Sequence, residues 1–324
     1  MRPRARPVLV APDSFKGTMS ARVVAEAVGR GLESAGFAVD LAPVADGGEG
    51  TADALLGRLG GEIVLAEAHD PLGRPLRASF ALIGDGATAL VEVAQASGLA
   101  LVAPDERDAE AASSAGTGEL IAAAIEAGAR RVLVAAGGSA TTDGGLGATE
   151  AIEAAGGLRG ARLVVICDVR TPFERAAAVF APQKGADPAA VARLERRLEA
   201  FGLPRGVPMT GAAGGLSGGL WAWLGAELVA GAPFVLDTLD FDARLDGALA
   251  VVVGEGRLDA TSLQGKVAAE IATRARQRGV PAHAIVGSCA IDRFDARILD
   301  LQEIREAGDE QELAAAAASL SGVL

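Results

Sequence analysis

An apolar segment that stops at paired glycines places the strongest constraint on this chain. Val132 to Ala136 is predicted as a buried strand, Gly137-Gly138 ends it, and a hydroxyl-rich segment closed by Asp143 follows. Paired glycines let the backbone turn sharply and let a ligand approach the main chain. Exposed N–H groups and hydroxyls suit phosphate oxygens, and a carboxylate can bind Mg²⁺. The stretch therefore predicts either a phosphate-binding loop or a tight strand-to-helix turn that binds nothing.

Composition excludes several classes of protein. A length of 324 residues favours about two domains, and no apolar run approaches the roughly 18 residues of a membrane span. The net charge of −12 argues against nucleic acid and anionic membranes as partners. The basic segment Met1–Pro7 leads into only a short strand, so no signal peptide is predicted, and we expect a cytoplasmic protein. Cys167 and Cys289 are expected to be buried free thiols.

Strands and helices alternate at both ends of the chain. At the start, a strand over Val8–Val10, a helix over Met19–Ala35, a strand over Ala38–Val44 and a helix over Ala52–Leu59 are expected. This order is typical of a parallel sheet with crossover helices. The pattern returns near the end of the chain, with strands expected over Leu245–Val253 and His283–Val286 and helices over Leu263–Arg278 and Glu312–Leu320.

The middle of the chain has a different pattern. Short strands joined by turns are expected over Ile63–Leu65, Arg77–Ile83 and Thr88–Val93, and a meander like this suggests the start of a second domain. We therefore expect an α/β protein. Its first domain is a discontinuous parallel-sheet (Rossmann/flavodoxin-like) domain, 1–61 with 245–324, and 62–244 forms an inserted mixed α/β domain. Within the insert, further expected elements are a helix over Leu120–Ala127, a strand over Leu163–Asp168, a helix that begins at Asp187-Pro188 and ends at Phe201, and a helix that carries Trp221 and Trp223 as packing residues.

The loops that follow the expected strands carry the chemistry. Ligands of parallel sheets bind beyond the carboxyl ends of the strands. Phosphoryl transfer needs a metal ion, cations on the phosphates and a carboxylate that accepts the hydroxyl proton. Each residue taken alone could be a solvated surface lysine or a helix cap. The lysines beside glycines are Lys16, Lys184 and Lys266, and the aspartates at strand ends are Asp13, Asp46, Asp143, Asp168 and Asp259.

Two common nucleotide motifs are absent from the sequence. Ala260 to Val267 fails the phosphate-loop pattern at its first and last positions, and Gly254-Glu-Gly256 lacks the third glycine of the dinucleotide fingerprint. Seven other motifs together resemble the glycerate kinase family of the bacterial type I kind. They are Ala11-Pro-Asp-Ser-Phe-Lys16, Pro43-Val-Ala-Asp-Gly-Gly-Glu-Gly-Thr51, Gly116-Thr-Gly-Glu-Leu120, Gly137-Gly-Ser-Ala-Thr-Thr-Asp-Gly-Gly145, Pro182-Gln-Lys-Gly-Ala186, Gly211-Ala-Ala-Gly-Gly215, and Gly254-Glu-Gly-Arg-Leu-Asp259 with Gln264-Gly-Lys266.

The resemblance implies phosphorylation of D-glycerate by ATP with Mg²⁺, with 2-phosphoglycerate favoured as product, and two α/β domains with the active-site cleft between them. The chain departs from the family pattern in two places. The connection between Glu153 and Leu163 is short, and Thr171-Pro172-Phe173 stands where relatives have an Asn-Pro and a glycine loop. These departures keep two alternatives open, a catalytically silent ligand-binding relative and a kinase for another small hydroxy acid. A homodimer also remains possible.

The resemblance assigns roles to residues of the motifs. Phosphate or nucleotide is expected at Gly137, Gly138, Ser139, Thr141, Gly116 and Thr117. The predicted catalytic residues are the cations Lys16 and Lys184 and a proton acceptor, Asp46 or Asp168. Substrate is expected at Asp13, Ser14, Glu255 and Arg257, with the Arg257 guanidinium on the glycerate carboxylate. The expected Mg²⁺ ligands are Asp143 and Asp46.

Overall fold

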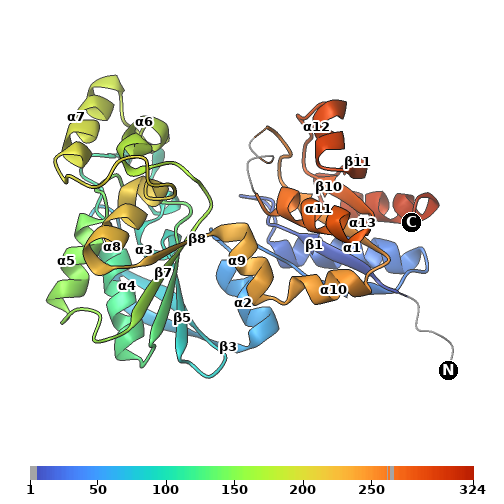
Figure 1. Ribbon diagram of the computed structural model, residues 1–324, viewed down its shortest axis with the longest axis horizontal. Coiled ribbons are helices and arrows are strands. Elements are labelled where there is room, and N and C mark those ends of the chain that lie inside the picture. Colours follow the sequence, from blue (N-terminus) through green and yellow to red (C-terminus); the bar gives the residue numbers. More distant parts are fainter. Residues whose placement is uncertain (1–5, 261, 263–265) are drawn as a thin grey trace. The chain divides into compact units, whose positions relative to one another are not determined.

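The chain divides into two compact units (Figure 1). The computed structural model describes residues 6–260, 262 and 266–324. Unit 1 comprises the chain up to Asp46 together with Ala232–Leu324, and unit 2 comprises Gly47–Gly231. The sequence predicts these two boundaries at 61/62 and 244/245 instead. The segment 47–61, which includes α2 (Thr51–Leu59), therefore belongs to unit 2, and the segment 232–244 belongs to unit 1.

Unit 1 is built on a five-stranded sheet in the order β11-β10-β9-β1-β2, and every strand pair is parallel. Because crossover helices cover a parallel sheet, its strands are apolar, and β1 and β9 are buried along their whole length. The elements of unit 1 are β1 (Val8–Pro12), α1 (Ala21–Ser34), β2 (Val39–Leu41), α9 (Gly231–Thr238), α10 (Phe241–Gly247), β9 (Ala250–Glu255), α11 (Val267–Arg278), β10 (Ala282–Val286), α12 (Arg293–Ile298), β11 (Leu301–Glu306) and α13 (Glu310–Ser319).

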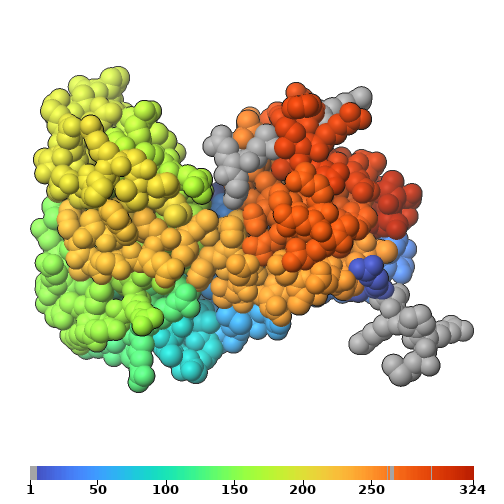
Figure 2. All heavy atoms as spheres, in the orientation of Figure 1, coloured from blue at the N-terminus to red at the C-terminus, as the bar shows by residue number. Residues whose placement is uncertain are grey.

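The core of unit 1 lies between the sheet and the helix pair α1 and α13. Val8, Val10 and Val252 of the strands pack there against Leu32 and Leu313 of the helices. Helix α11 contacts β9 and β10, and α10 packs on α11. Helix α12 lies at the surface of unit 1 (Figure 2), where the Phe294 side chain is 70% exposed.

Unit 2 contains a six-stranded mixed sheet in the order β3-β4-β5-β6-β7-β8. The first two strand pairs are antiparallel and the remaining three are parallel. Helices α4, α5 and α8 share its main core. The elements of unit 2 are α2 (Thr51–Leu59), β3 (Gly61–His69), β4 (Pro75–Ile83), β5 (Thr88–Glu92), α3 (Ala94–Ser97), α4 (Ala115–Glu126), β6 (Arg131–Ala135), α5 (Leu146–Ala154), β7 (Arg162–Cys167), α6 (Ala176–Phe180), α7 (Pro188–Glu199), α8 (Leu216–Leu224) and β8 (Glu227–Ala230).

The predicted fold class, α/β with one parallel and one mixed sheet, is confirmed. Asp187 caps α7 as expected, because its side chain accepts a hydrogen bond from Ala190 N. Trp223 packs edge-on against Phe201, as a packing residue should.

Several predicted boundaries are wrong. The strand expected from Leu245 begins at Ala250, because Phe241–Gly247 is helical with Leu245 in the core, and β8, β11 and α12 have no counterpart in the prediction. The helix expected from Leu263 begins at Val267, and the segment 263–265 lies outside the described residues. Both cysteines are free as predicted, but Cys289 is only half-buried. Within the described part of the chain, no helix is both long and apolar enough to cross a bilayer.

Candidate active site

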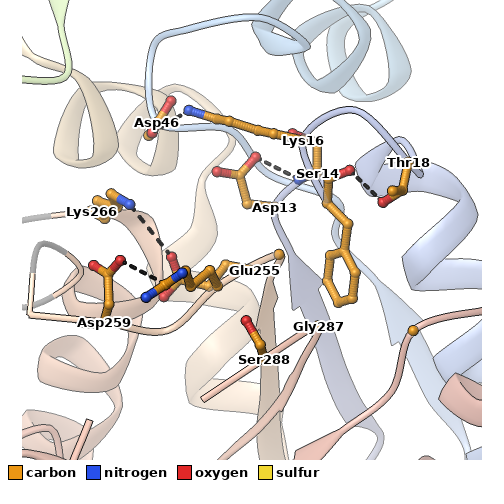
Figure 3. Close-up of a pocket in the computed structure, with 14 residues that line it drawn as sticks. Asp13, Ser14, Lys16, Thr18, Asp46, Glu255, Asp259, Lys266, Gly287 and Ser288 are labelled. Carbon is orange, nitrogen blue, oxygen red and sulfur yellow. Dashed lines mark hydrogen bonds and ion pairs between the residues drawn. The ribbon is translucent and has the colours of Figure 1, made fainter. Parts of the chain in front are cut away.

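The exit loops of all five strands of the unit 1 sheet line one cavity of about 420 Å³ (Figure 3). Parallel strands put their carboxyl ends on the same edge, and ligand sites of such sheets lie there. The lining residues are Asp13, Ser14, Phe15, Lys16 and Thr18 after β1, Asp46 after β2, Glu255 at the end of β9, Gly256, Arg257, Asp259 and Lys266 after β9, Gly287 and Ser288 after β10, and Gly308 after β11.

Strand register puts two carboxylates side by side at this edge. Pro12 pairs with Gly254, and Asp13 N donates to the Gly254 carbonyl at 2.8 Å, so the pairing runs one residue past β1. Asp13 therefore lies beside Glu255, the last residue of β9. Phe15, 3% exposed, anchors the loop that follows in the core, and the Lys16 side chain is 67% exposed at the loop tip.

Burial and like charge perturb the acids of the cavity. Burial, then the Asp46 carboxylate, raises the pKa of Asp13 to about 7, against the opposing effects of the Ser14 N–H (2.6 Å) and Lys16. Burial also raises the pKa of Glu255. Glu255 Oε1 is buried and has no hydrogen-bond partner among the described residues, although Lys266 Nζ lies 3.9 Å from Oε2. An unsatisfied buried carboxylate oxygen of this kind can accept a hydrogen bond from a ligand.

Basic side chains balance these acids. Lys16 Nζ lies 3.9 Å from Asp46 Oδ2, and Arg257 Nε lies 3.3 Å from Asp259 Oδ2 with the Arg257 side chain 68% exposed. Figure 3 shows the Lys16 ammonium directed at Asp46 and the Lys266 ammonium directed at Glu255. The cavity thus brings together six predicted site residues, Asp13, Ser14, Lys16, Asp46, Glu255 and Arg257. Asp259, Lys266 and Ser288 also line the cavity but had no predicted role in the site. The sequence carried a signal for two of them, because Asp259 stands at a strand end and Lys266 beside a glycine.

In unit 2 the predicted phosphate loop, Gly137 to Gly145, follows β6 directly. Close backbone packing shapes its start, since a Cβ on Gly137 would lie 2.6 Å from Gly48 Cα. Two hydrogen bonds from other segments then fix its course. Leu99 N donates to the Gly138 carbonyl, and Ala140 N donates to the Ser97 carbonyl, both at 2.8 Å.

Asp143 organises the second half of this loop. Its Oδ2 accepts hydrogen bonds from Ser114 N, Ser114 Oγ and Gly147 N, and its Oδ1 accepts one from Gly145 N. The side chain is buried, and its oxygens are engaged in joining the loop to the starts of α4 and α5. The geometry therefore supports a structural role for Asp143 and adds no support to its prediction as a Mg²⁺ ligand.

Lys184 lies under the same loop rather than at the protein surface. The residue is 2% exposed, and its Nζ donates to Ser139 Oγ at 2.9 Å and to the Thr141 carbonyl. Burial lowers the pKa of Lys184 to about 7, and Asp143 opposes this effect. The hydroxyls of Thr141 and Thr142 are buried without a hydrogen-bond partner. The loop thus holds polar groups that are not satisfied within the protein.

The remaining predicted residues lie behind the loop or beside it. Gly116 and Thr117 are part of α4, not of a loop. Glycine is required at position 116 for packing, because a Cβ there would lie 2.0 Å from the His69 carbonyl oxygen. Thr117 is fully buried and donates to Ser97 Oγ, so it supports the loop indirectly. Asp168 follows β7 and is half-buried; its charge adds to burial in raising the pKa of the Cys167 thiol.

Comparisons with known proteins identify the family of this chain. A family model described as the glycerate kinase family matches residues 8–156 and 153–319. The glycerate kinase of Bacillus subtilis (strain 168) is 38% identical over 88% of this chain and 86% of that protein. The glycerate 2-kinase of Escherichia coli (strain K12) is 36% identical over the same shares. A crystal structure from Salmonella typhimurium LT2, described as a glycerate kinase 2, has a TM-score of 0.83 at 32% identity and covers 99% of this chain and 98% of that one.

The family model and these relatives identify the chain as a kinase, a phosphotransferase with an alcohol group as acceptor. The chain belongs to the glycerate kinase family, as its seven motifs predict.

Proposed function

We propose that this protein transfers the γ-phosphoryl group of ATP to the C2 hydroxyl of D-glycerate, giving 2-phosphoglycerate and ADP. The observation that carries the proposal is the unit 1 cavity, which combines buried acids with exposed cations and has ample room for a small hydroxy acid. The name of the Escherichia coli relative, glycerate 2-kinase, supports C2 over C3.

The acceptor acid occupies the unit 1 cavity in this account. The forked guanidinium of Arg257, 68% exposed, pairs with the glycerate carboxylate. Asp13, held by the Ser14 N–H and 7% exposed, accepts the proton of the attacking hydroxyl, a role that the sequence had left to Asp46 or Asp168. The new O–P bond forms at the glycerate oxygen while the bond from the γ-phosphorus to the bridging oxygen of ADP breaks. Glu255 Oε1, which lacks a partner, accepts a hydrogen bond from the other hydroxyl.

The nucleotide phosphates occupy the unit 2 loop in this account. The backbone at Gly137 and Gly138 and the hydroxyls of Ser139 and Thr141 supply neutral donors, which suit a phosphate chain. In the unit 1 cavity, Lys16, whose side chain is 67% exposed, supplies a cation for the phosphoryl group that is transferred.

Mg²⁺ fits this set of donors. The ion usually keeps several waters and takes only one or two protein carboxylates together with substrate phosphates. Among the described residues no group of three metal-ligating side chains occurs, and the unit 1 cavity offers separate carboxylates instead. Asp46 is the residue that would hold the ion, and the ion would neutralise charge on the phosphates.

One assay tests the proposal. ADP release is measured with Mg-ATP and D-glycerate, and then with a panel of other small hydroxy acids. We expect turnover with D-glycerate and a loss of kcat/KM of roughly 10² or more in Lys16→Ala and in Asp46→Asn. Arg22→Ala, a change at an exposed position on α1, is the matched control and should match wild type. ATP binding without turnover of any acid would contradict the proposal and favour the silent relative, and preference for another acid would reassign the substrate.

A further inference from the structure

The position of Lys184 limits what its ammonium can do. It lies at the end of a 3₁₀ turn, Pro182–Lys184, and is 2% exposed. Two of its three N–H bonds are directed at Ser139 Oγ and at the Thr141 carbonyl. An ammonium committed in this way is a poor candidate for direct contact with a phosphate that enters from solvent, which is the role predicted for it from sequence.

The hydrogen bond to Ser139 has a consequence for that hydroxyl. In its ammonium form Lys184 only donates, so Ser139 Oγ is then the acceptor and its own O–H points away from Lys184. A serine hydroxyl otherwise rotates among several orientations. Lys184 therefore leaves Ser139 with its proton available to a further acceptor.

The hydrogen bond to the Thr141 carbonyl acts on the backbone in the same way. A trans peptide holds its C=O and the following N–H in opposite directions. With the Thr141 carbonyl directed at Lys184, the N–H of Thr142 is directed away from it. The chain packs tightly here, since a Cβ on Gly214 would lie 1.9 Å from the Thr141 oxygen. The peptide thus has little freedom to turn over.

The residue type fits this local role. Only three of the 30 basic residues of the chain are lysines, and one of them is buried at this place. A compact ammonium on a flexible stem fits a small buried site, whereas a planar guanidinium needs more space.

We propose that Lys184 is a positioning residue that orients the Ser139 hydroxyl as a donor to a nucleotide phosphate and holds the buried Thr141–Thr142 peptide in place, without touching the phosphate itself. The inference rests on the proposed function, in which this loop binds the nucleotide. It predicts that Lys184 and Ser139 act as one unit.

A double-mutant cycle on the full-length protein tests this coupling. ADP binding is measured by calorimetry, and kcat and the KM for ATP are measured with D-glycerate. Lys184→Met and Ser139→Ala should each weaken ADP binding and raise the KM for ATP about tenfold, with kcat changed less than about threefold. The double variant should be no worse than either single one. Arg196→Met, at an exposed position on α7, is the control.

Lys184→Gln separates orientation from charge, because its amide still donates a hydrogen bond but carries no charge. We expect near-wild-type ADP affinity in this variant. If Lys184→Met does not fold, Lys184→Gln still tests the inference. Multiplicative losses in the double variant, or a Gln variant as weak as the Met variant, would overturn the inference. Failure of wild type to bind ADP at all would instead contradict the proposed function.

Discussion

The Asp143 carboxylate accepts hydrogen bonds from both the backbone N–H and the hydroxyl of Ser114, each at 2.8 Å. Ser114 Oγ in turn accepts one from Ala148 N in α5. One buried pair therefore joins the starts of two helices to the loop that follows β6. The loop is held from within the protein, which leaves its outward polar groups for a ligand.

Asp143→Asn should destabilise unit 2. An asparagine places an N–H₂ group where a carboxylate oxygen accepts N–H donors, and hydrogen bonds to a charged group contribute about 1.5–3 kcal/mol. We expect the free energy of unfolding to fall by about 2–3 kcal/mol, measured by urea unfolding. Asp105→Asn, at an exposed position, is the control. Wild-type stability in Asp143→Asn would show that this network is not required for the loop.

Gly214→Ala should disturb the loop that follows β6. Gly214 has φ +67°, and an added Cβ would meet the Thr141 oxygen. Backbone strain and this clash together should cost about 2 kcal/mol or more and weaken ADP binding, measured by unfolding and calorimetry. Gly247→Ala is the matched control, because nothing lies within 4 Å of a Cβ there. Equal behaviour of the two variants would count against the packing role of Gly214.

Asp13→Asn should lower kcat and raise thermal stability. Folding raises the pKa of Asp13 from 3.8 to about 7, so between these values the folded state holds a proton that the unfolded state has released. Stability therefore falls as the pH rises through that window. The variant should lose about 10²-fold or more in kcat and gain thermal stability, more at about pH 8 than at about pH 5. A variant that keeps wild-type kcat would exclude Asp13 as proton acceptor.

His283 should limit stability in acid. It is fully buried in β10 with both ring nitrogens unpartnered, and burial lowers its pKa, with Arg305 adding to this effect and Glu303 opposing it. The unfolded state takes up the proton first, so stability is complete above about pH 6.5 and falls as the pH drops through the folded pKa. His283→Leu should flatten this acid limb in unfolding experiments and add about 1 kcal/mol at neutral pH. His69→Leu, at a side chain that is 46% exposed, should leave the limb in place.

The unit 1 site could be predicted from sequence because its residues follow strands of one parallel sheet, and such strands end at a common edge. Asp13, Lys16 and Asp46 were found in this way, whereas Glu255 was assigned through the resemblance to the family. Burial could not be predicted by the same means. Lys16 and Lys184 both stand beside a glycine, yet Lys16 is exposed and Lys184 is buried, because Lys184 hydrogen-bonds to Ser139 and Thr141 of the loop that covers it.

Helix α4 shows a second limit of sequence reasoning. Gly116 and Gly118 lower the intrinsic preference for helix, so the segment was predicted as a loop. Close approach of α4 to β3 and α5 requires glycine at both positions, and this tertiary packing outweighs the local preference. The boundary between α10 and β9 shows the same limit. Leu245 of α10 is apolar like the strand that follows it, so the strand was predicted to begin too early.

The central claim, phosphoryl transfer from ATP to the C2 hydroxyl of D-glycerate, is tested most directly by the phosphorus NMR spectrum of the product. The phosphorus of 2-phosphoglycerate couples to the single proton on C2, and that of 3-phosphoglycerate couples to the two protons on C3. Our account predicts a new doublet that grows with the ADP signals when wild type is incubated with Mg-ATP and D-glycerate. A triplet would place the phosphate on C3, and the absence of any new ester signal while ATP remains bound would contradict the claim.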